Sequence, residues 1–161
     1  MRDSHDSVLD RTDDDDVVGC PGHLHLLQMK AKKRSDLMDN WSLHSDIGST
    51  IVSVQFSSIG LDSLPPDIFE CLSNLEELTV DDNKLTNIPA PKKPHGLQTM
   101  NISKNQVTSL DVTQFSGTLT TLVLEENPLG ELPSSLFLAT KLYELNARNI
   151  GLKEVPDDIG K

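Results

Sequence analysis

Three side chains that could bind a metal ion lie close together near the N-terminus. Cys20, His23 and His25 occur in the run CPGHLH, and thiolate and imidazole groups are the ligands that zinc prefers. A structural zinc site needs four ligands, however, and no second cluster of cysteine and histidine follows in this chain, which has two cysteines in all. The sequence therefore predicts no metal site and no cofactor.

Other reactive residue types also lack the surroundings that catalysis requires. The run Asp13 to Asp16 has neither the alternating spacing nor the glycine of a calcium loop, which favours a solvated acidic tail. Cys71 lies beside Ile68 and Leu72, where a small buried hydrophobic residue is expected rather than a nucleophile. The chain has no glycine-rich phosphate loop and no G-x-S-x-G motif. We therefore predict that the protein is not an enzyme.

The strongest pattern in the sequence is an internal repeat. Segments that begin at Ile51, Leu75, Leu97, Leu119 and Leu142 follow one another at spacings of 24, 22, 22 and 23 residues. Each matches the pattern L-x-x-L-x-L-x-x-N-x-L, as in LEELTVDDNKLTNIP and LTTLVLEENPLGELP. A period of this length with this pattern is the leucine-rich-repeat signature. The sequence predicts an α/β fold, a right-handed solenoid with a parallel sheet on its concave face.

The positions that recur in every repeat have structural explanations. Alternate side chains of a strand point the same way, so the fourth and sixth positions are expected inside. Those positions are occupied by Val54 and Phe56, Leu78 and Val80, Met100 and Ile102, Leu122 and Leu124, and Leu145 and Ala147. Asn83, Asn105 and Asn127 follow where the chain leaves the strand, and we expect their amides to form a ladder of hydrogen bonds to the backbone. Ile59 and Ile150 replace this asparagine in the first and last repeats.

The second half of each repeat is expected to form the convex side. PPDIFECLSN and PSSLFLATK have the apolar spacing of short helices, whereas PAPKKPHG is rich in proline and is expected to be extended. The last repeat stops in this half, which would leave the edge from Leu142 to Ala147 open to self-association and suggests a fragment of a longer array. We expect three regions: an acidic disordered tail over 1–20, a helical cap or linker over 21–50, and about five repeats over 51–161, with the last one incomplete.

The repeats resemble those of intracellular leucine-rich-repeat proteins with the Leu-Pro signature, such as Ras-pathway scaffolds, Scribble-like polarity proteins and plant Ras-group proteins. The matching residues are the strand leucines, the asparagine and the proline at the end of the motif, as at Pro89 and Pro133. The resemblance covers 51–161 and implies a docking surface without enzymatic activity. It also implies a signalling scaffold or a regulatory subunit.

The strand positions that vary from repeat to repeat hold the candidate residues for binding a partner. They point outward from the concave face, and acidic residues predominate among them, so we expect a protein partner with a basic segment. Tyr143 is the aromatic residue in this set and the best candidate for an energetic hot spot. The predicted concave binding residues are Glu77, Thr79, Asp81, Asp82, Thr99, Asn101, Lys104, Val123, Glu125, Glu126, Tyr143, Glu144, Asn146 and Arg148. The competing interpretation is a solvated sheet face whose charges maintain solubility.

The segment before the repeats carries a basic cluster. From Pro21 to Trp41 the apolar spacing favours an amphipathic helix that covers the first repeat, because a repeat beginning at Leu24 would keep too few consensus positions. Lys30, Lys32, Lys33 and Arg34 supply the alternative function, in which the array is a structural or autoregulatory appendage and this helix contacts anionic membranes.

Charge and cysteine content point to a class of partner and a compartment. The net charge of -11 argues against nucleic-acid binding, which needs basic residues to neutralise phosphates. The N-terminus has no apolar signal segment, and no stretch is long and apolar enough to span a membrane. Together with the two cysteines, these features predict a cytoplasmic protein.

Overall fold

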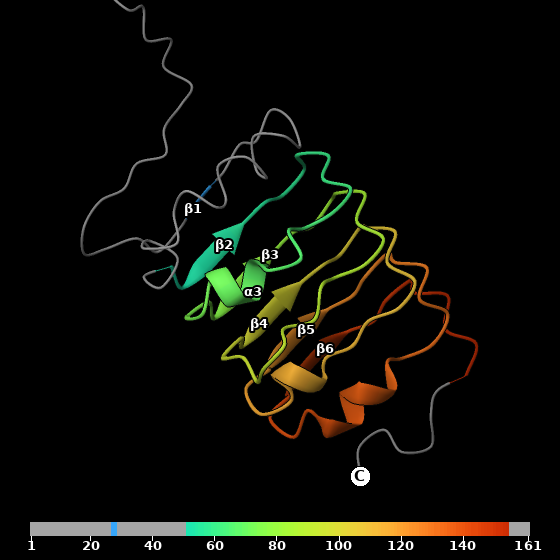
Figure 1. Cartoon of the computed structure of the whole chain (residues 1–161). Helices are drawn as coiled ribbons and strands as arrows, with labels where there is room; N and C mark the ends of the chain where they lie inside the picture. Colours follow the sequence, from blue (N-terminus) through green and yellow to red (C-terminus); the bar gives the residue numbers. More distant parts are fainter. Residues whose placement is uncertain (1–26, 29–50, 155–161) are drawn as a thin grey trace, which may run out of the picture.

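Six short strands lie side by side in the order in which they occur along the chain (Figure 1). The structure is a computed structural model and describes residues 27–28 and 51–154. The strands are β1 (Leu27–Gln28), β2 (Ser53–Gln55), β3 (Glu77–Thr79), β4 (Thr99–Asn101), β5 (Thr121–Val123) and β6 (Glu144–Asn146). Every neighbouring pair is parallel. This arrangement confirms the predicted leucine-rich-repeat solenoid.

Equivalent positions of successive repeats lie opposite one another in the sheet. Val54, Leu78, Met100, Leu122 and Leu145 lie opposite one another on successive strands. We call the five repeats coils 1 to 5, which begin at Ile51, Leu75, Leu97, Leu119 and Leu142. Since one coil cannot bury its own apolar edge, each coil depends on its neighbours for a core.

Short helical segments form much of the convex side. The two segments predicted to be helical contain α3 (Ile68–Cys71) and η2 (Ser134–Leu138), a 3-10 helix. The proline-rich connector between β3 and β4 contains no helix, as expected. A further 3-10 helix, η1 (Thr113–Phe115), was not anticipated. The Thr113 N–H and hydroxyl donate hydrogen bonds to the Asp111 carboxylate before it, and these bonds lower the pKa of Asp111 below its usual value.

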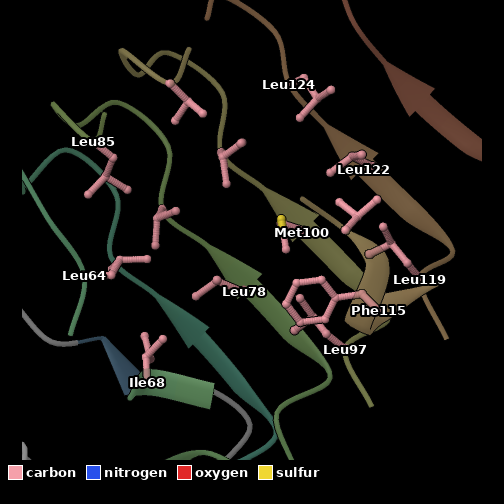
Figure 2. Packing of buried hydrophobic residues seen from close by; sticks show 14 of the residues in the cluster. Leu64, Ile68, Leu78, Leu85, Leu97, Met100, Phe115, Leu119, Leu122 and Leu124 are labelled. Atoms are coloured by element: carbon pink, nitrogen blue, oxygen red, sulfur yellow. The ribbon is translucent and has the colours of Figure 1, made fainter. Parts of the chain in front are cut away.

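The core is aliphatic along the sheet and aromatic beneath the convex segments. Leu78, Met100 and Leu122 are fully buried on successive strands, as Figure 2 shows. Phe69 and Phe115 come from the convex side, and both are buried. Their rings meet edge to face with centroids 5.0 Å apart, a favourable arrangement for aromatic pairs.

The N-terminal segment differs from the expected helix where the structure describes it. Leu27–Gln28 form a strand, β1, that pairs with β2 and places Leu27 opposite Val54. This is the register that a repeat beginning at Leu24 would have, so the prediction of a helix is wrong at these two residues. The physical reason is the open edge of β2, because a strand satisfies unpaired backbone groups that a helix would leave bare. The other residues of 21–50, including the basic cluster, lie outside the described residues, as do residues 1–20.

The last coil does not bury both of its strand residues as predicted. Leu145 is 36% exposed and Ala147 is half-buried, whereas Leu122 and Leu124 in coil 4 are completely buried. Within the described residues no strand follows β6, so its inward side chains are covered on one side only.

The eighth residue of every coil has an unusual backbone conformation. Ser58, Asp82, Lys104, Glu126 and Asn149 all have φ between 54° and 57°, the left-handed region. A side chain in this region crowds the following carbonyl, and only glycine, asparagine and aspartate adopt it at low cost. The turn therefore stores strain at lysine and glutamate, which the neighbouring coils offset. The N–H of Lys104, for example, donates to the carbonyl of Glu125 at 2.8 Å.

Replacing Lys104 by glycine is expected to stabilise the fold. Glycine removes the steric cost of the left-handed conformation, and the gain should be about 0.5–1 kcal/mol after the loss of chain entropy is subtracted. Urea unfolding of the two proteins measures it. Gln106→Gly is the matched control, because Gln106 is exposed but does not have positive φ, and glycine there should destabilise instead. Equal effects of both variants would contradict the account.

Candidate functional site

The concave face is organised as columns that cross the strands. The third, fifth and seventh positions of each coil point away from the core, and the sheet register aligns them from coil to coil. The third-position column consists of Ser53, Glu77, Thr99, Thr121 and Glu144. The fifth-position column consists of Gln55, Thr79, Asn101, Val123 and Asn146. The seventh-position column consists of Ser57, Asp81, Ser103, Glu125 and Arg148. Adjacent members of a column are about 4.8 Å apart, the spacing of strands.

None of the predicted binding residues is buried. Ten of the fourteen lie in these columns, Asp82, Lys104 and Glu126 occupy the eighth position, and Tyr143 precedes β6. Tyr143 is 79% exposed. The prediction omitted Thr121, which lies in the third-position column, and Glu76, which precedes β3 as Tyr143 precedes β6; both are accessible to solvent.

Coil 2 carries the densest negative charge of the concave face. Glu76, Glu77, Asp81 and Asp82 form what we call the coil-2 acidic patch; Asp81 is half-buried and the others are exposed. Serine hydroxyls of coil 1 donate to three of these carboxylates: Ser53 to Glu77 at 3.0 Å, Ser57 to Asp81, and Ser58 to Asp82 at 2.6 Å. These bonds orient the carboxylates but leave their charge. Among the described residues no cation pairs with any of the four.

Coil 4 carries carboxylates in a different environment. Glu125 lies 3.7 Å from the guanidinium of Arg148 and accepts a hydrogen bond from the Asn146 amide at 3.1 Å. This is the one ion pair in the described part of the chain. The described residues therefore partly compensate the negative charge of the concave face at coils 4 and 5, and none of them forms an ion pair with the carboxylates of coil 2.

An asparagine at the turn joins neighbouring coils beneath this face. The Asn105 side-chain amide lies 2.9 Å from the Val80 carbonyl of coil 2 and 3.0 Å from the Ile102 and Ser103 carbonyls of its own coil. Its side-chain oxygen accepts the Leu85 N–H at 3.0 Å. Asn83 and Asn127 make corresponding bonds, so the three amides satisfy buried backbone groups of four coils.

Coils 4 and 5 are joined at the turn without an asparagine side chain. Ile150 takes the place of the asparagine in coil 5 and is 1% exposed. Its backbone carbonyl accepts the Gly130 N–H at 2.7 Å. A direct backbone bond thus joins coils 4 and 5 where a side-chain amide joins the earlier ones. Gly130 and Gly151 have φ of 76° and 75°, which glycine adopts without the crowding that a β-carbon would cause.

His95 has partners that the sequence did not reveal. The residue is buried, and its ring stacks edge to face on Phe69 at 5.2 Å and on Phe115 at 6.0 Å. Nδ1 accepts the Leu97 N–H at 3.2 Å, and Nε2 lies 3.1 Å from the Leu72 carbonyl. These partners require the neutral tautomer with the proton on Nε2. His95, in coil 2, thus joins the convex side of its own coil to Phe69 and Leu72 of coil 1 and to Phe115 of coil 3.

Other chemistry has little support in the described residues. Within 51–154, no group of three or more His, Cys, Asp and Glu side chains could hold a metal ion. Cys20, His23 and His25 lie outside the described residues. Cys71 is half-buried at the end of α3, with its thiol 3.6 Å from the Asp67 carboxylate. Over the described part of the chain, the helices are too short to cross a lipid bilayer.

Comparison with known proteins supports the repeat type. No model of a known protein family matches the chain. Lumican of Gallus gallus and lumican of Coturnix japonica are each 29% identical to it over 119 residues, which cover 71% of this chain. The chain spans about a third of the length of these relatives, with 34% covered. The similarity to these leucine-rich-repeat proteins indicates a protein-binding module.

Two predictions from the sequence need correction or lack support after this comparison. The predicted cytoplasmic location is contradicted, because the lumican relatives are secreted proteins of the extracellular matrix. The physical arguments from cysteine content and from the N-terminus were thus insufficient to assign a compartment. The resemblance to intracellular Ras-pathway scaffolds is not supported beyond the leucine-rich-repeat type itself.

Proposed function

We propose that this chain is a non-enzymatic module that binds a protein on its concave sheet, as part of a scaffold or regulatory subunit. The observation that carries the proposal is the coil-2 acidic patch, whose four carboxylates meet no cation in the described structure. Ion pairs within a solvated face tend to cancel its charge, as Arg148 does for Glu125. An uncompensated patch held in place by serine hydroxyls suits an incoming cation.

The chemistry of the face favours a basic segment of the partner. Lysine and arginine side chains would meet the patch, while hydroxyl and amide groups of Thr79, Thr99 and Asn101 offer hydrogen bonds to an adjacent polar backbone. Tyr143 supplies an exposed aromatic surface at the other end of the sheet. Because the sheet and its ladder are rigid, binding would cost little ordering of this chain.

Three double variants, each with two acidic residues changed to lysine, test the patch. Each variant is compared with the wild type for the proteins that it captures from a native extract. We expect Asp81→Lys with Asp82→Lys to abolish capture, with a loss of about tenfold or more in affinity. Glu125→Lys with Glu126→Lys should have a smaller effect, because Arg148 already compensates Glu125. Glu131→Lys with Glu154→Lys makes the same change in net charge at exposed residues outside the concave columns and should leave capture unchanged.

Circular dichroism first establishes that all three variants fold. Retention of the same proteins by the Asp81 and Asp82 variant would contradict the proposal and favour a solvated face. Equal losses in all three variants would show that net charge, not the patch, determines binding.

A further inference from the structure

One asparagine of the concave face belongs to a tripeptide that enzymes can modify. Asn101, Ile102 and Ser103 form the sequence N-x-S, the acceptor for N-linked glycosylation, which needs a hydroxyl residue two places after the asparagine. Asn101 is the last residue of β4, and Ser103 follows in the seventh-position column. Within 51–154 no other asparagine has a serine or threonine at this spacing.

The side-chain nitrogen of Asn101 is free within the described part of the chain. The Asn101 Oδ1 accepts the Ser103 N–H at 3.0 Å and the Ser103 hydroxyl at 2.8 Å. A backbone N–H can only donate, so the amide atom that it faces is the oxygen and the other atom is Nδ2. This Nδ2 makes no hydrogen bond to a described residue, whereas the Nδ2 atoms of Asn83, Asn105 and Asn127 are bound to backbone carbonyls.

The neighbours of Asn101 leave space above the sheet. Asn101 is half-buried, and its partners across the sheet are Thr79 on β3 and Val123 on β5, which are half-buried as well. Both have short, uncharged side chains at the strand spacing of about 4.8 Å. Since the fifth position points away from the core, a group attached to Nδ2 can extend into solvent without displacing a side chain of the core.

Only a protein that enters the secretory pathway can receive this modification. A cytoplasmic chain would never meet the enzyme that transfers glycans to asparagine. The predicted cytoplasmic location is contradicted, because the lumican relatives are secreted. The objection that the compartment would have raised against Asn101 as an acceptor is thereby removed.

We propose that Asn101 carries an N-linked glycan on the concave face. The donor is an oligosaccharide whose first N-acetylglucosamine is linked to a lipid diphosphate. In the transfer, Nδ2 of Asn101 forms a bond to the anomeric carbon of that sugar, and the bond from this carbon to the diphosphate oxygen breaks. Nδ2 loses one proton, and the lipid diphosphate leaves. The transfer requires no oxidant or reductant.

The glycan would lie beside the coil-2 acidic patch, because Asn101 is in coil 3 and pairs with Thr79 of coil 2. It would take the Asn101 amide away from a partner's backbone, whereas the amide linkage itself adds no cation to the carboxylates of the patch. Whether Asn101 is glycosylated does not depend on the proposed binding function, and the two are tested by different measurements.

Secretion of the full chain from animal cells, behind a cleavable signal peptide, tests the proposal. The reference chain and all variants carry Asn40→Gln, which removes the other N-x-S tripeptide of the sequence. Digestion with peptide-N-glycosidase in heavy-oxygen water should lower the mass of most reference chains and leave a labelled aspartate at position 101. Asn101→Gln and Ser103→Ala should each carry no glycan, whereas Ser103→Thr keeps the hydroxyl and should carry it.

A positive control makes the absence of a glycan informative. Gln106→Asn, introduced together with Asn101→Gln, creates the tripeptide N-V-T at an exposed position and should be modified. A reference chain without a glycan beside a glycosylated control would overturn the proposal, as would a glycan that persists in Asn101→Gln alone. Occupancy is measured in the medium and in the cells. A glycosylated reference chain that stays in the cells while Asn101→Gln is secreted would also overturn it, because the fold would then not tolerate the glycan.

Discussion

Replacing Asn105 by alanine is expected to lower the free energy of unfolding by about 3–5 kcal/mol. The buried amide serves Val80, Ile102 and Ser103 carbonyls and the Leu85 N–H. Alanine leaves the Leu85 N–H without a partner, and an unsatisfied buried group costs about 1–3 kcal/mol. It also removes one hydrogen bond from each of the three carbonyls, which keep their bonds from Asn83, Asn127 and the Asp82 N–H, and each lost bond costs about 0.5–1.5 kcal/mol. This loss is a large part of a total stability of about 5–15 kcal/mol, which is typical of a domain.

Urea unfolding followed by circular dichroism measures this effect, and two variants control for it. Asn105→Asp keeps the acceptor for Leu85 but loses the donors, so it should also be strongly destabilised. Gln106→Ala changes the exposed neighbour and should shift stability by less than about 0.5 kcal/mol. An Asn105→Ala protein as stable as the Gln106→Ala protein would show that the ladder bonds contribute nothing net.

The second large effect is expected at His95. Alanine there removes a buried ring that packs against both Phe69 and Phe115 and leaves the Leu97 N–H unpaired. The Leu72 carbonyl loses one of its two hydrogen bonds and keeps the one from the Leu75 N–H. The cavity and the lost bonds together should cost about 3–5 kcal/mol. Since the ring joins coil 2 to coils 1 and 3, thermal unfolding should also become less cooperative, as expected of an array joined through nearest neighbours.

His95→Phe separates packing from hydrogen bonding. The phenylalanine keeps an aromatic ring in the cluster but makes neither bond, so about 1–3 kcal/mol should still be lost. Lys93→Ala, an exposed change in the same connector, provides the baseline. Nitrogen chemical shifts of the imidazole should report a proton on Nε2. A proton on Nδ1, or a His95→Phe protein as stable as the wild type, would contradict the bonding described here.

The core and the sheet could be predicted from the sequence because repetition makes one physical requirement visible several times. Leu78, Met100 and Leu122 occupy the same position of successive repeats and are all completely buried. The period gives the register directly, since a solenoid stacks equivalent residues. The helical segments around Ile68 and Leu136 followed in the same way from apolar spacing.

Features that depend on one particular contact were not predictable. No sequence signal reveals that His95 packs against Phe69 and Phe115, because they are 26 and 20 residues away along the chain. The left-handed turn at Lys104 contradicts local preference and is imposed by hydrogen bonds to the next coil. β1 was taken for part of a helix because its repeat retains few consensus residues, and its pairing with β2 becomes visible only in space.

The candidate site was predictable in position but not in its electrostatic detail. Alternation along the strands placed Glu77 and Asp81 on the concave face. The sequence did not show that serines of coil 1 orient the carboxylates of coil 2, or that Arg148 compensates Glu125. That difference between the two acidic regions makes coil 2 the better candidate for contact with a basic partner.

The most direct test of the binding surface is to map a basic peptide on the chain by amide chemical shifts. A synthetic peptide of alternating lysine and threonine, titrated into the labelled protein, presents the chemistry that the patch is proposed to recognise. We predict saturable shifts that are largest at Glu77, Thr79, Asp81 and Asp82 and absent from the Asp81→Lys, Asp82→Lys protein. Shifts centred on the convex residues, or no saturable shift up to about 1 mM peptide, would contradict the proposal that this face binds a basic segment.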